Sequence, residues 1–322
     1  MTGTSNYIKV KRKILITGGA GFIGSCLAER LAQEETNQLV LVDNLLTGSQ
    51  KNLPQTIHKN TKFIKANVNN YKDISSIFHT YAFDYVFHYA AMVGVKRTIE
   101  NPARVLNDLV GIRNILDLSK NTGVKRVFYS SSSEVYGEPV EYPQNEYTTP
   151  LNSRLPYAIV KNVGEASLRA YYKEYGLNFT IFRFFNTYGP KQSTDFVISK
   201  FLDAAVKNQD ITIYGDGMQT RTFCYIEDHL DATVNAFYHN LIANDVANIG
   251  SEKEITIIDL ARLIIKLTKS KSKIVFLDPL AEGDMTRRKP DIEKMRKLLN
   301  HESTQLEDGI RAIIKSNHLV TA

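Results

Sequence analysis

The sequence predicts an α/β protein, with a doubly wound parallel sheet followed by a smaller, mixed C-terminal lobe. Up to about residue 190, short β-type runs alternate with stretches of helical periodicity. Such alternation is typical of a parallel sheet covered by helices on both faces. Beyond that point the alternation stops and helices dominate. We therefore expect a sheet domain over residues 1–190 and a second lobe over residues 191–322.

Six runs in the first part have the composition of strands, and helical stretches separate them. They are residues 13–17, 38–43, 61–65, 84–89, 125–130 and 178–183. The clearest helical stretch is 102–119, with Pro102 suited to its first turn and Gly123 beyond its end; a second covers 156–175. In the C-terminal lobe, the runs at 211–215, 247–250 and 273–277 predict short strands.

Composition excludes several classes of protein. The chain has 322 residues, 43% hydrophobic and 23% charged, which is enough to bury a large core. Cys26 and Cys224 lie outside any C-x-x-C pattern, so we expect neither a disulfide framework nor a metal site. No apolar run is long enough to span a membrane, and the polar start lacks the apolar core of a signal peptide. We expect a cytoplasmic protein without a membrane partner.

The charge balance indicates a partner that carries negative charge. Lysine and arginine number 40 against 34 acidic residues, a formal excess of +6. A nucleic-acid partner is not expected, because the sequence contains no basic stripe with interleaved aromatic residues. A small phosphorylated substrate needs only a few arginines, and it is the better hypothesis.

The first predicted strand runs directly into a glycine-rich turn that is typical of dinucleotide binding. Glycines at Gly18, Gly21 and Gly24 allow a tight turn and close approach of the backbone to a pyrophosphate. Phe22 and Ile23 open the helix that follows, whose N-terminal N–H groups can bind phosphate. The strand before the turn and the helix after it make the motif specific. They predict a Rossmann-type domain.

The end of the second predicted strand indicates which dinucleotide binds. Asp43 is placed to accept hydrogen bonds from the ribose hydroxyls of the adenosine, and its carboxylate would repel a 2′-phosphate. The segment from Asn44 to Gln50 contains no arginine or lysine that could bind such a phosphate. NAD is therefore favoured over NADP.

Tyr157 and Lys161 are candidates for acid–base chemistry. They are four residues apart in a predicted helix, so both side chains lie on one face. An ammonium beside a phenol favours the phenolate, as a base that removes an alcohol proton requires. Ser132, Ser133 and Glu134 follow a predicted strand, at the sheet edge where ligands of open α/β sheets bind.

With these motifs the chain resembles the extended short-chain dehydrogenase/reductase family, in particular its nucleotide-sugar epimerase, dehydratase and decarboxylase branch. The resemblance covers nearly the whole length. It includes TGGAGFIG, FHYAAMVGV (87–95), SSSEVYG, the Tyr157/Lys161 pair, RFFNTYGP (183–190), the segment 211–228 and EGDMTRRKPDI (282–292). One departure is Asn67, where relatives usually carry an aspartate that contacts adenine.

The resemblance implies a tightly held NAD and oxidation of a nucleotide sugar at its C4 hydroxyl. Tyr157 would be the base, Lys161 would hold the nicotinamide ribose and lower the pKa of Tyr157, and Ser132 would hydrogen-bond the reacting oxygen. Further cofactor contacts implied are Asn67, Val68, Ala90 and Ala91, and substrate contacts are Ser133, Asn186, Arg221 and Arg288, the arginines binding the diphosphate. The C-terminal lobe would mainly bind the nucleotide sugar, and helices 102–119 and 156–175 match the pair that forms a homodimer seam in relatives.

Three outcomes can follow the shared oxidation: 4-epimerisation, loss of carbon dioxide, or loss of water from C5 and C6. The loop MVGVKRT and the segment AIVK differ from those usual in decarboxylases, and Ser133 stands where glucose-type dehydratases carry Asp. These departures favour a UDP-sugar 4-epimerase. Glu134, at the position of the dehydratase carboxylate, and the run RRKPDI keep a lyase as the alternative. A reductase or a non-catalytic NAD-binding regulator is more remote, since a regulator would be expected to lose Tyr157 or Lys161.

Overall fold

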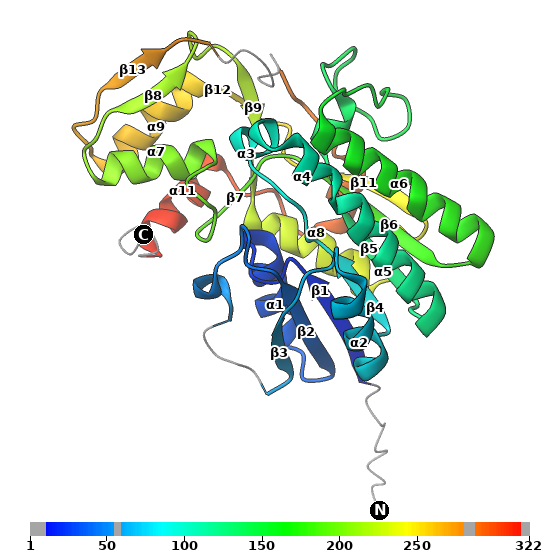
Figure 1. Cartoon of the computed structure of the whole chain (residues 1–322). Coiled ribbons are helices and arrows are strands. Elements are labelled where there is room, and N and C mark those ends of the chain that lie inside the picture. Colours follow the sequence, from blue (N-terminus) through cyan, green and yellow to red (C-terminus); the bar gives the residue numbers. More distant parts are fainter. Residues whose placement is uncertain (1–10, 55–58, 280–286, 317–322) are drawn as a thin grey trace, which may run out of the picture.

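A computed structural model describes residues 11–54, 59–279 and 287–316, and it shows a seven-stranded parallel sheet with smaller sheets at the C-terminal end (Figure 1). The strand order is β11-β6-β5-β4-β1-β2-β3, and every neighbouring pair is parallel. The strands are β1 (Arg12–Thr17), β2 (Asn37–Asp43), β3 (Thr61–Lys65), β4 (Tyr85–His88), β5 (Arg126–Ser132), β6 (Asn178–Phe184) and β11 (Asp245–Ile249). The chain order reverses between β1 and β4, which is where ligands of such sheets bind.

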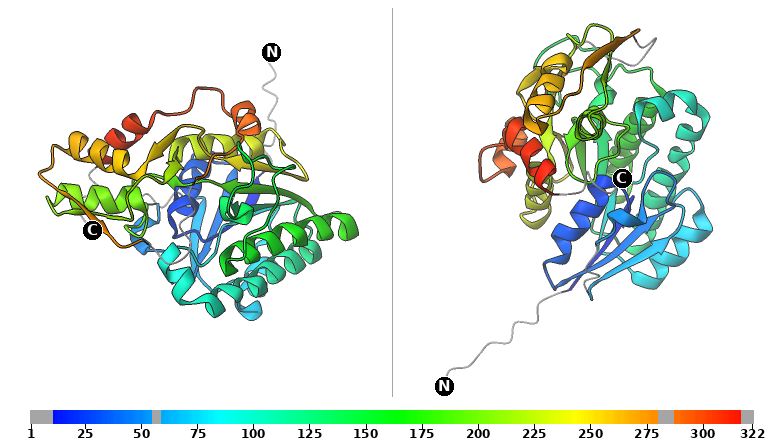
Figure 2. Two further views of the ribbon diagram at one scale, coloured as in Figure 1. Left: turned by 90° about the horizontal axis from the view of Figure 1, so that it is seen from above. Right: turned by 90° about the vertical axis from the view of Figure 1, so that its left-hand side faces the viewer.

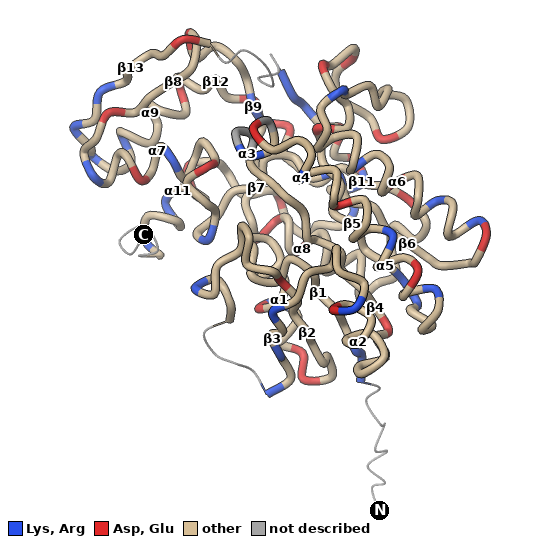
Figure 3. Tube along the Cα trace, in the orientation of Figure 1, with Lys and Arg blue, Asp and Glu red and all other residues tan. Residues whose placement is uncertain are grey.

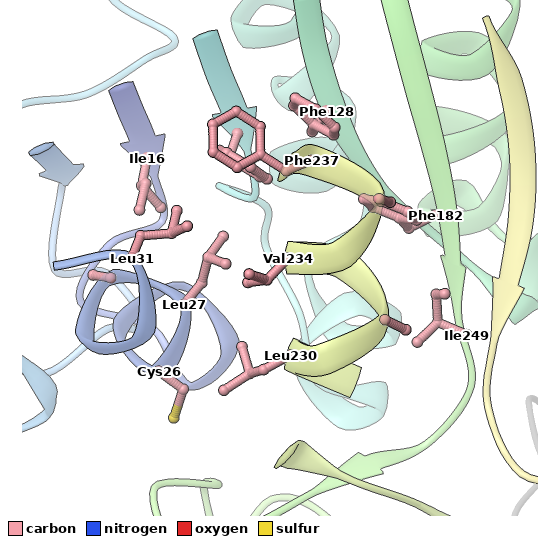
Figure 4. Close-up of a cluster of buried hydrophobic side chains, with 14 of the residues drawn as sticks. Ile16, Cys26, Leu27, Leu31, Phe128, Phe182, Leu230, Val234, Phe237 and Ile249 are labelled. Carbon is pink, nitrogen blue, oxygen red and sulfur yellow. The ribbon is translucent and has the colours of Figure 1, made fainter. Parts of the chain in front are cut away.

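Helices cover both faces of this sheet, as the view from above in Figure 2 shows. One face carries α2 (Tyr71–Tyr81), α5 (Asp108–Thr122) and α6 (Pro156–Tyr175); the other carries α1 (Phe22–Ala32), α8 (Ile226–Tyr238) and α10 (Glu293–Leu298). Successive strand residues point to opposite faces, so Ile14 and Ile16 pack with α1 and α8 while Leu15 packs with α2 and α5. In Figure 4, Leu27 and Leu31 of α1 face Leu230 and Val234 of α8 beneath the sheet.

The C-terminal lobe has its own apolar core. Helices α7 (Val197–Val206), α9 (Ile257–Thr268) and α11 (Leu306–Lys315) pack together around Leu202, Leu260 and Ile310, all fully buried. The small two-stranded sheets pair β10 (Cys224–Tyr225) with β7 (Thr187–Tyr188), β12 (Glu254–Thr256) with β9 (Thr220–Thr222), and β13 (Ile274–Leu277) with β8 (Ile211–Tyr214). The short elements η1 (Gln50–Asn52), α3 (Val95–Glu100), α4 (Pro102–Leu106) and η2 (Ser133–Tyr136) lie in the loops.

The structure confirms the predicted fold class and corrects two elements. The expected strand 247–250 does not belong to the lobe: β11 extends the main sheet beside β6, with Val246 and Ala247 fully buried. The predicted helix 102–119 is divided into two helices: α4 ends at Leu106, Asn107 lies between them, and α5 begins at Asp108. The division at residue 190 stays a prediction, and α8, β11 and α10 return from beyond it to the sheet.

Neither charged nor strongly apolar residues are concentrated in one long segment of the described chain. Acidic and basic segments are interspersed over the trace in Figure 3. Across the described ranges, no helix has the length and hydropathy needed to cross a membrane.

Candidate active site

A cavity of about 690 Å³ lies at the carboxyl ends of the sheet strands, between the sheet and the C-terminal lobe. Its walls come from the turns after β1, β2, β3, β4, β5 and β6, together with α6, the start of α7 and the segment that contains Arg288. The sheet therefore brings the turns of its strands to one place, as the switch in strand order predicts.

The glycine turn forms one wall and leaves no room for side chains. Gly18 has a φ of +72°, and a Cβ added there would lie 2.8 Å from the backbone of Tyr89 and Ala90. A Cβ on Gly24 would lie 2.2 Å from the carbonyl oxygen of Gly18. Gly21, Phe22 and Ile23 line the same wall at the start of α1. The bare backbone and the helix N-terminus form a cradle that suits a pyrophosphate.

Asp43 ends β2 at the far side of this cradle and is held by the backbone. Its Oδ2 accepts a hydrogen bond from Ala20 N at 3.0 Å, and its Oδ1 accepts one from Leu45 N at 2.7 Å. The side chain lines the cavity and is 8% exposed. A fixed carboxylate with lone pairs left over suits ribose hydroxyls, which are hydrogen-bond donors.

The other predicted cofactor residues line the same cavity: Asn44, Asn67, Val68, Ala90 and Ala91. Asn67, which replaces the usual aspartate, uses its Oδ1 to accept a hydrogen bond from Asn69 N at 3.1 Å. The side-chain carbonyl of Asn67 therefore stabilises the turn formed by residues 67–69. The residues present fit an NAD molecule, since the cradle, the ribose acceptor and the apolar wall are all in place.

Ser132 and Tyr157 meet at the inner end of the cavity. Ser132 ends β5, Tyr157 lies in the first turn of α6, and a hydrogen bond between the two side chains favours the phenolate of Tyr157. Ser132 Oγ also accepts a hydrogen bond from Glu134 N at 3.2 Å. This pair is arranged to bind one oxygen of a substrate and to move its proton.

Lys161 lies one helical turn after Tyr157 and is almost fully buried. Its Nζ donates to Ser130 O at 2.6 Å and stands 5.7 Å from the centre of the Tyr157 ring. Burial lowers the pKa of Lys161 to about 8, and the nearby carboxylate of Asp108 opposes that change. The ammonium is thus fixed at the cavity wall, where it can contact a ribose.

The lowered phenol pKa that we expected from Lys161 is not what the protein groups produce. Burial raises the pKa of Tyr157 above its ordinary value, and the negative charge of Glu134 raises it further. The hydrogen bond with Ser132 and the positive charge of Arg288 only partly offset these effects. Desolvation is the largest of these effects, since Tyr157 is half-buried in the cavity wall, where neighbouring groups displace water from the phenol.

Glu134 and Arg288 form an ion pair in the cavity, although they lie far apart in the sequence. Arg288 Nη1 is 2.8 Å from Glu134 Oε1, and the two side chains are 7% and 17% exposed. Both line the cavity with Ser132 and Tyr157, and Glu134 Oε2 is buried without a hydrogen-bond partner among the described residues. The pair thus places one positive and one negative charge in the cavity wall beside Ser132 and Tyr157.

The remaining substrate residues divide into two groups. Ser133 and Asn186 line the cavity, and Asn186 Nδ2 donates to Thr222 O at 3.0 Å. Arg221 lies on β9 and is not part of the cavity wall, and its Nη1 donates to Thr220 O at 2.7 Å. The structure therefore separates Arg221 from Arg288 along the predicted binding path, with Arg288 at the catalytic end. Part of the motif EGDMTRRKPDI, residues 282–286, lies outside the described residues.

Sequence reasoning missed Asp108. Its Oδ2 accepts a hydrogen bond from Met92 N at 2.8 Å, and its charge acts on both Tyr157 and Lys161. An aspartate near the start of a helix is ordinary, so the residue type carried no signal. Only the fold brings it to the cavity.

A Rossmann-type sheet with a phosphate cradle and a Ser/Tyr/Lys site defines a class of enzymes that move hydride between a nicotinamide cofactor and an alcohol. The comparisons give the family. Residues 14–250 match the NAD dependent epimerase/dehydratase family, and the chain belongs to it. NAD is accordingly its cofactor, and nucleotide sugars are the substrates of this branch of the family.

Relatives carry more than one activity. A UDP-glucuronic acid decarboxylase of Danio rerio is 35% identical over 316 residues, covering 95% of this chain and 73% of its own length. Several other curated relatives are uronate decarboxylases as well, and one at 34% identity is a putative UDP-glucose 4-epimerase of Methanocaldococcus jannaschii. Among solved structures, the UDP-glucose 4-epimerase of Thermotoga maritima with UDP-glucose is similar at a TM-score of 0.89 and 30% identity, over 96% of this chain and 100% of that one.

A second solved structure combines both ligands expected here. It is the UDP-glucuronic acid 4-epimerase of Bacillus cereus in complex with UDP-glucuronic acid and NAD. Its TM-score is 0.87 at 28% identity, and the match covers 96% of this chain and 99% of that one. The chain is thus an NAD-dependent nucleotide-sugar enzyme of a branch that includes isomerases and lyases.

Proposed function

We propose that the protein is a lyase that removes the C6 carboxyl group of a nucleoside-diphosphate uronate such as UDP-glucuronate. The observation that carries this proposal is the buried Arg288–Glu134 ion pair beside Ser132 and Tyr157. The sequence alone favoured an epimerase. The ion pair changes that preference, because it puts a cation in the same cavity wall as Ser132 and Tyr157, near enough for its charge to act on the Tyr157 phenol.

The charges of the pair suit a carboxylate substrate. Removing both ions from water costs free energy that their attraction repays only with good geometry, so such a pair in a substrate cavity suggests a functional role. A sugar carboxylate can replace Glu134 as the partner of Arg288, and the planar guanidinium suits bidentate pairing with carboxylate. A neutral sugar offers no such exchange.

The first step is oxidation at C4. Ser132 holds the C4 oxygen, and Tyr157 removes its proton while Lys161 holds the ribose of the cofactor and supplies positive charge. NAD, when bound, accepts the hydride from C4. The product of this step is a ketone at C4 with a carboxylate on the neighbouring carbon C5, which is a β-keto acid.

The second step breaks the bond between C5 and C6. Carbon dioxide leaves, and the electron pair of that bond forms an enolate whose oxygen lies at Ser132 and Tyr157. Donors aimed at this oxygen stabilise the charge that develops there. C5 then takes up a proton that comes from solvent: Glu134, once displaced from Arg288 by the substrate carboxylate, takes a proton from water and is our candidate to pass it to C5. Tyr157 returns its proton to the C4 oxygen when the ketone is reduced again.

Other parts of the chain would bind the rest of the substrate. Arg221 is our candidate for the diphosphate, while Ser133 and Asn186 are candidates for the sugar and its first phosphate. Arg288, which the family resemblance placed on the diphosphate, is assigned here to the sugar carboxylate. These roles remain proposals, and so does a cytoplasmic location.

We also propose that the protein forms a homodimer through α5 and α6. Four apolar side chains on α4, α5 and α6 are unusually exposed: Leu106 at 45%, Val110 at 49%, and Ile159 and Val163 at 42% each. Ile159 and Val163 are four apart and form a stripe on α6, whereas Leu106 ends α4 and Val110 lies in the first turn of α5. Exposed apolar side chains of this kind favour burial against a partner.

The second candidate is a 4-epimerase, which the sequence favoured. Its support is the similarity to epimerases among solved structures, including one that binds UDP-glucuronic acid. In an epimerase the C5–C6 bond stays intact. The 4-keto sugar rotates in the site so that hydride returns to its other face, and Glu134 only positions a hydroxyl or a water.

The substrate panel that tests the proposal pairs neutral and uronate sugars on UDP, dTDP, CDP and GDP. We expect conversion of a uronate to a product lighter by the mass of carbon dioxide, and no conversion of the matching neutral sugar. A product of unchanged mass from the neutral sugars would contradict the proposal and favour the epimerase. A product lighter by the mass of water would indicate a dehydratase.

A further inference from the structure

A buried polar network lies behind the catalytic residues and connects α6 to the sheet. Glu165, one helical turn after Lys161, accepts hydrogen bonds from Ser131 Oγ at 2.6 Å and from Arg183 Nε and Nη2 at 2.9 and 2.7 Å. The side chains of Arg183 and Glu165 are only 2% and 3% exposed. Breaking a buried pair leaves an uncompensated charge, so this pair joins the catalytic helix firmly to β5 and β6.

The Nη1 atom of Arg183 starts a second chain of hydrogen bonds, which leads through Tyr136 to Asn248 of β11. Arg183 Nη1 donates to Tyr136 Oη at 2.9 Å, and Tyr136 Oη donates to Asn248 Oδ1 at 2.7 Å. This fixes the orientation of the Asn248 amide, because its Oδ1 is the acceptor. Asn248 Nδ2 then donates to Gln144 O at 2.9 Å and to Asp291 O at 3.2 Å.

The network ends on the backbone that follows Arg288. Gln144 N donates to Lys289 O at 2.7 Å, and Asp291 N donates to Gln144 O at 2.8 Å. These bonds form an isolated parallel bridge between Gln144 and Pro290. The chain next to Arg288 is therefore held by Gln144 and, through the Asp291 carbonyl, by Asn248.

Both members of the Arg288–Glu134 pair depend on this network. Glu134 and Tyr136 belong to the same short helix, η2, while residues 289–291 follow Arg288 directly. We propose that Asn248, oriented by Tyr136, is a positioning residue that sets Arg288 against Glu134 and so against a carboxylate on the sugar. This inference rests on the proposed function. Asn248 is fully buried and not part of the cavity wall, so it acts without touching substrate.

The physical reason is preorganisation. An arginine side chain has many rotamers, and ordering it costs free energy each time a ligand binds. A backbone fixed beside Arg288 removes part of that cost before the substrate arrives. Loosening it should weaken recognition of the carboxylate and leave recognition of the nucleotide intact.

The test is a double-mutant cycle on ligand binding, made in the Tyr157→Phe background so that the sugar is not consumed. Calorimetry compares UDP-glucuronate with UDP-glucose, which lacks the carboxylate. We expect Asn248→Ala to weaken binding of UDP-glucuronate about tenfold and binding of UDP-glucose less than about twofold. In a protein that also carries Arg288→Ala, adding Asn248→Ala should change binding of UDP-glucuronate less than about twofold, because Asn248 acts through Arg288.

A second variant keeps the test decisive if Asn248→Ala does not fold. Tyr136→Phe removes the hydroxyl that orients Asn248, while Arg183 Nη1, which also donates to that hydroxyl, keeps Glu146 O as an acceptor at 3.1 Å; the variant should weaken UDP-glucuronate binding selectively by a smaller factor. Tyr238→Phe is the matched control: its hydroxyl accepts a hydrogen bond from Asn37 Nδ2 at 2.8 Å, outside the cavity, and both ligands should bind unchanged.

Two results would overturn the inference. One is an equal loss of affinity for both sugars, which is what mere structural damage would cause; the other is an effect of Asn248→Ala that simply adds to that of Arg288→Ala. Failure of the proposed function is a separate result. If the unmodified enzyme converts UDP-glucuronate without losing carbon dioxide, the lyase proposal fails, whereas the binding cycle still reports whether Asn248 positions Arg288.

Discussion

At the scale of single residues, burial and hydrogen bonding act in opposite directions on the pKa of the catalytic base. Tyr157 lines the cavity half-buried; desolvation raises the pKa of its phenol, and the hydrogen bond with Ser132 acts in the opposite direction. Lys161 is held against Ser130 O, so its charge cannot move away from the cofactor wall. A base of this kind works best when the substrate oxygen completes the hydrogen bonds.

Tyr157→Phe should lower turnover by roughly 10² to 10⁴ and leave NAD binding nearly unchanged, because the ring still packs while the proton acceptor is gone. Steady-state rates and calorimetry with NAD measure the two effects. Tyr172→Phe, at an exposed position on the same helix, is the matched control and should keep full activity. Near-normal turnover of the Tyr157 variant would show that another group is the base.

Arg221→Ala should weaken binding of UDP by on the order of 1.5–3 kcal/mol, the range for hydrogen bonds to charged groups. Lysine at this position should restore only part of the affinity, since a point charge cannot reproduce the planar fork. Calorimetry with plain UDP gives the answer. Arg262→Ala, which removes an exposed arginine from α9, should have no effect. Equal affinities in all four proteins would remove Arg221 from the binding site.

Sequence reasoning predicted contacts between residues that are close in the sequence and did not predict which distant residues pair. Tyr157 and Lys161 share a helix face, so their spacing alone predicted their meeting. Glu134 and Arg288 were each singled out, but no local pattern relates them, and only the return of the C-terminal segment to the sheet brings them together. The raised pKa of Tyr157 was out of reach for the same reason, since burial depends on the whole fold.

At the scale of elements, the catalytic helix was predicted with its full length and the helix before it was not. α6 begins with Pro156 and ends before Gly176, which has a φ of +71°, and both are strong boundary signals. The segment 102–119 has a helical period of apolar residues on both sides of Asn107, so the sequence pattern did not reveal that α4 ends and α5 begins there. The break places Asp108 at the start of α5, from which it reaches the cavity.

A glutamate in place of an exposed valine on each of α5 and α6 should prevent dimerisation. We expect sedimentation of the unmodified protein to give twice the 36.4 kDa chain mass and the double variant Val110→Glu/Val163→Glu to give one chain mass. The dimer dissociation constant should rise about 100-fold or more, because the interface would bury unpaired carboxylates. Val275→Glu, which changes an apolar residue 38% exposed in the C-terminal lobe, should leave the mass unchanged. A monomeric unmodified protein would rule out the proposed seam.

At the scale of the molecule, the two parts of the chain interleave. α8 and α10 cover one face of the main sheet and β11 extends it, although all three follow residue 190. A short apolar run such as 247–250 signals a strand but not the sheet it joins, because pairing depends on contacts between distant segments. The overall class of the fold was predictable from the alternation of elements. The return of α8, β11 and α10 to the main sheet was not.

Buried histidines should make the protein sensitive to acid. Burial lowers the pKa of His88 and His229 to about 3, from an ordinary value of 6.5. Below about pH 6.5 the unfolded chain binds protons that the folded chain does not, so stability falls as pH drops through this window toward 3. Each histidine contributes up to about 1.4 kcal/mol per pH unit.

His229→Gln should therefore reduce the pH dependence of the free energy of unfolding by up to about 1.4 kcal/mol per unit between about pH 6 and about pH 4. Urea denaturation at several pH values measures it. The exposed His79→Gln is the control, and its slope should match that of the unmodified protein. An unchanged slope in the His229 variant would mean that this histidine is protonated in the folded state.

The most direct test of the account follows the hydrogen at C5 during conversion of UDP-glucuronate in deuterated water. Loss of the C6 carboxyl leaves C5 to take its hydrogen from solvent, so we predict one deuterium at C5 of a UDP-pentose, with release of carbon dioxide. Glu134→Gln should slow this conversion strongly, since an amide cannot deliver the proton. A UDP-uronate epimer that carries no deuterium, formed at a similar rate by the Glu134→Gln variant, would contradict the lyase account and establish the epimerase in its place.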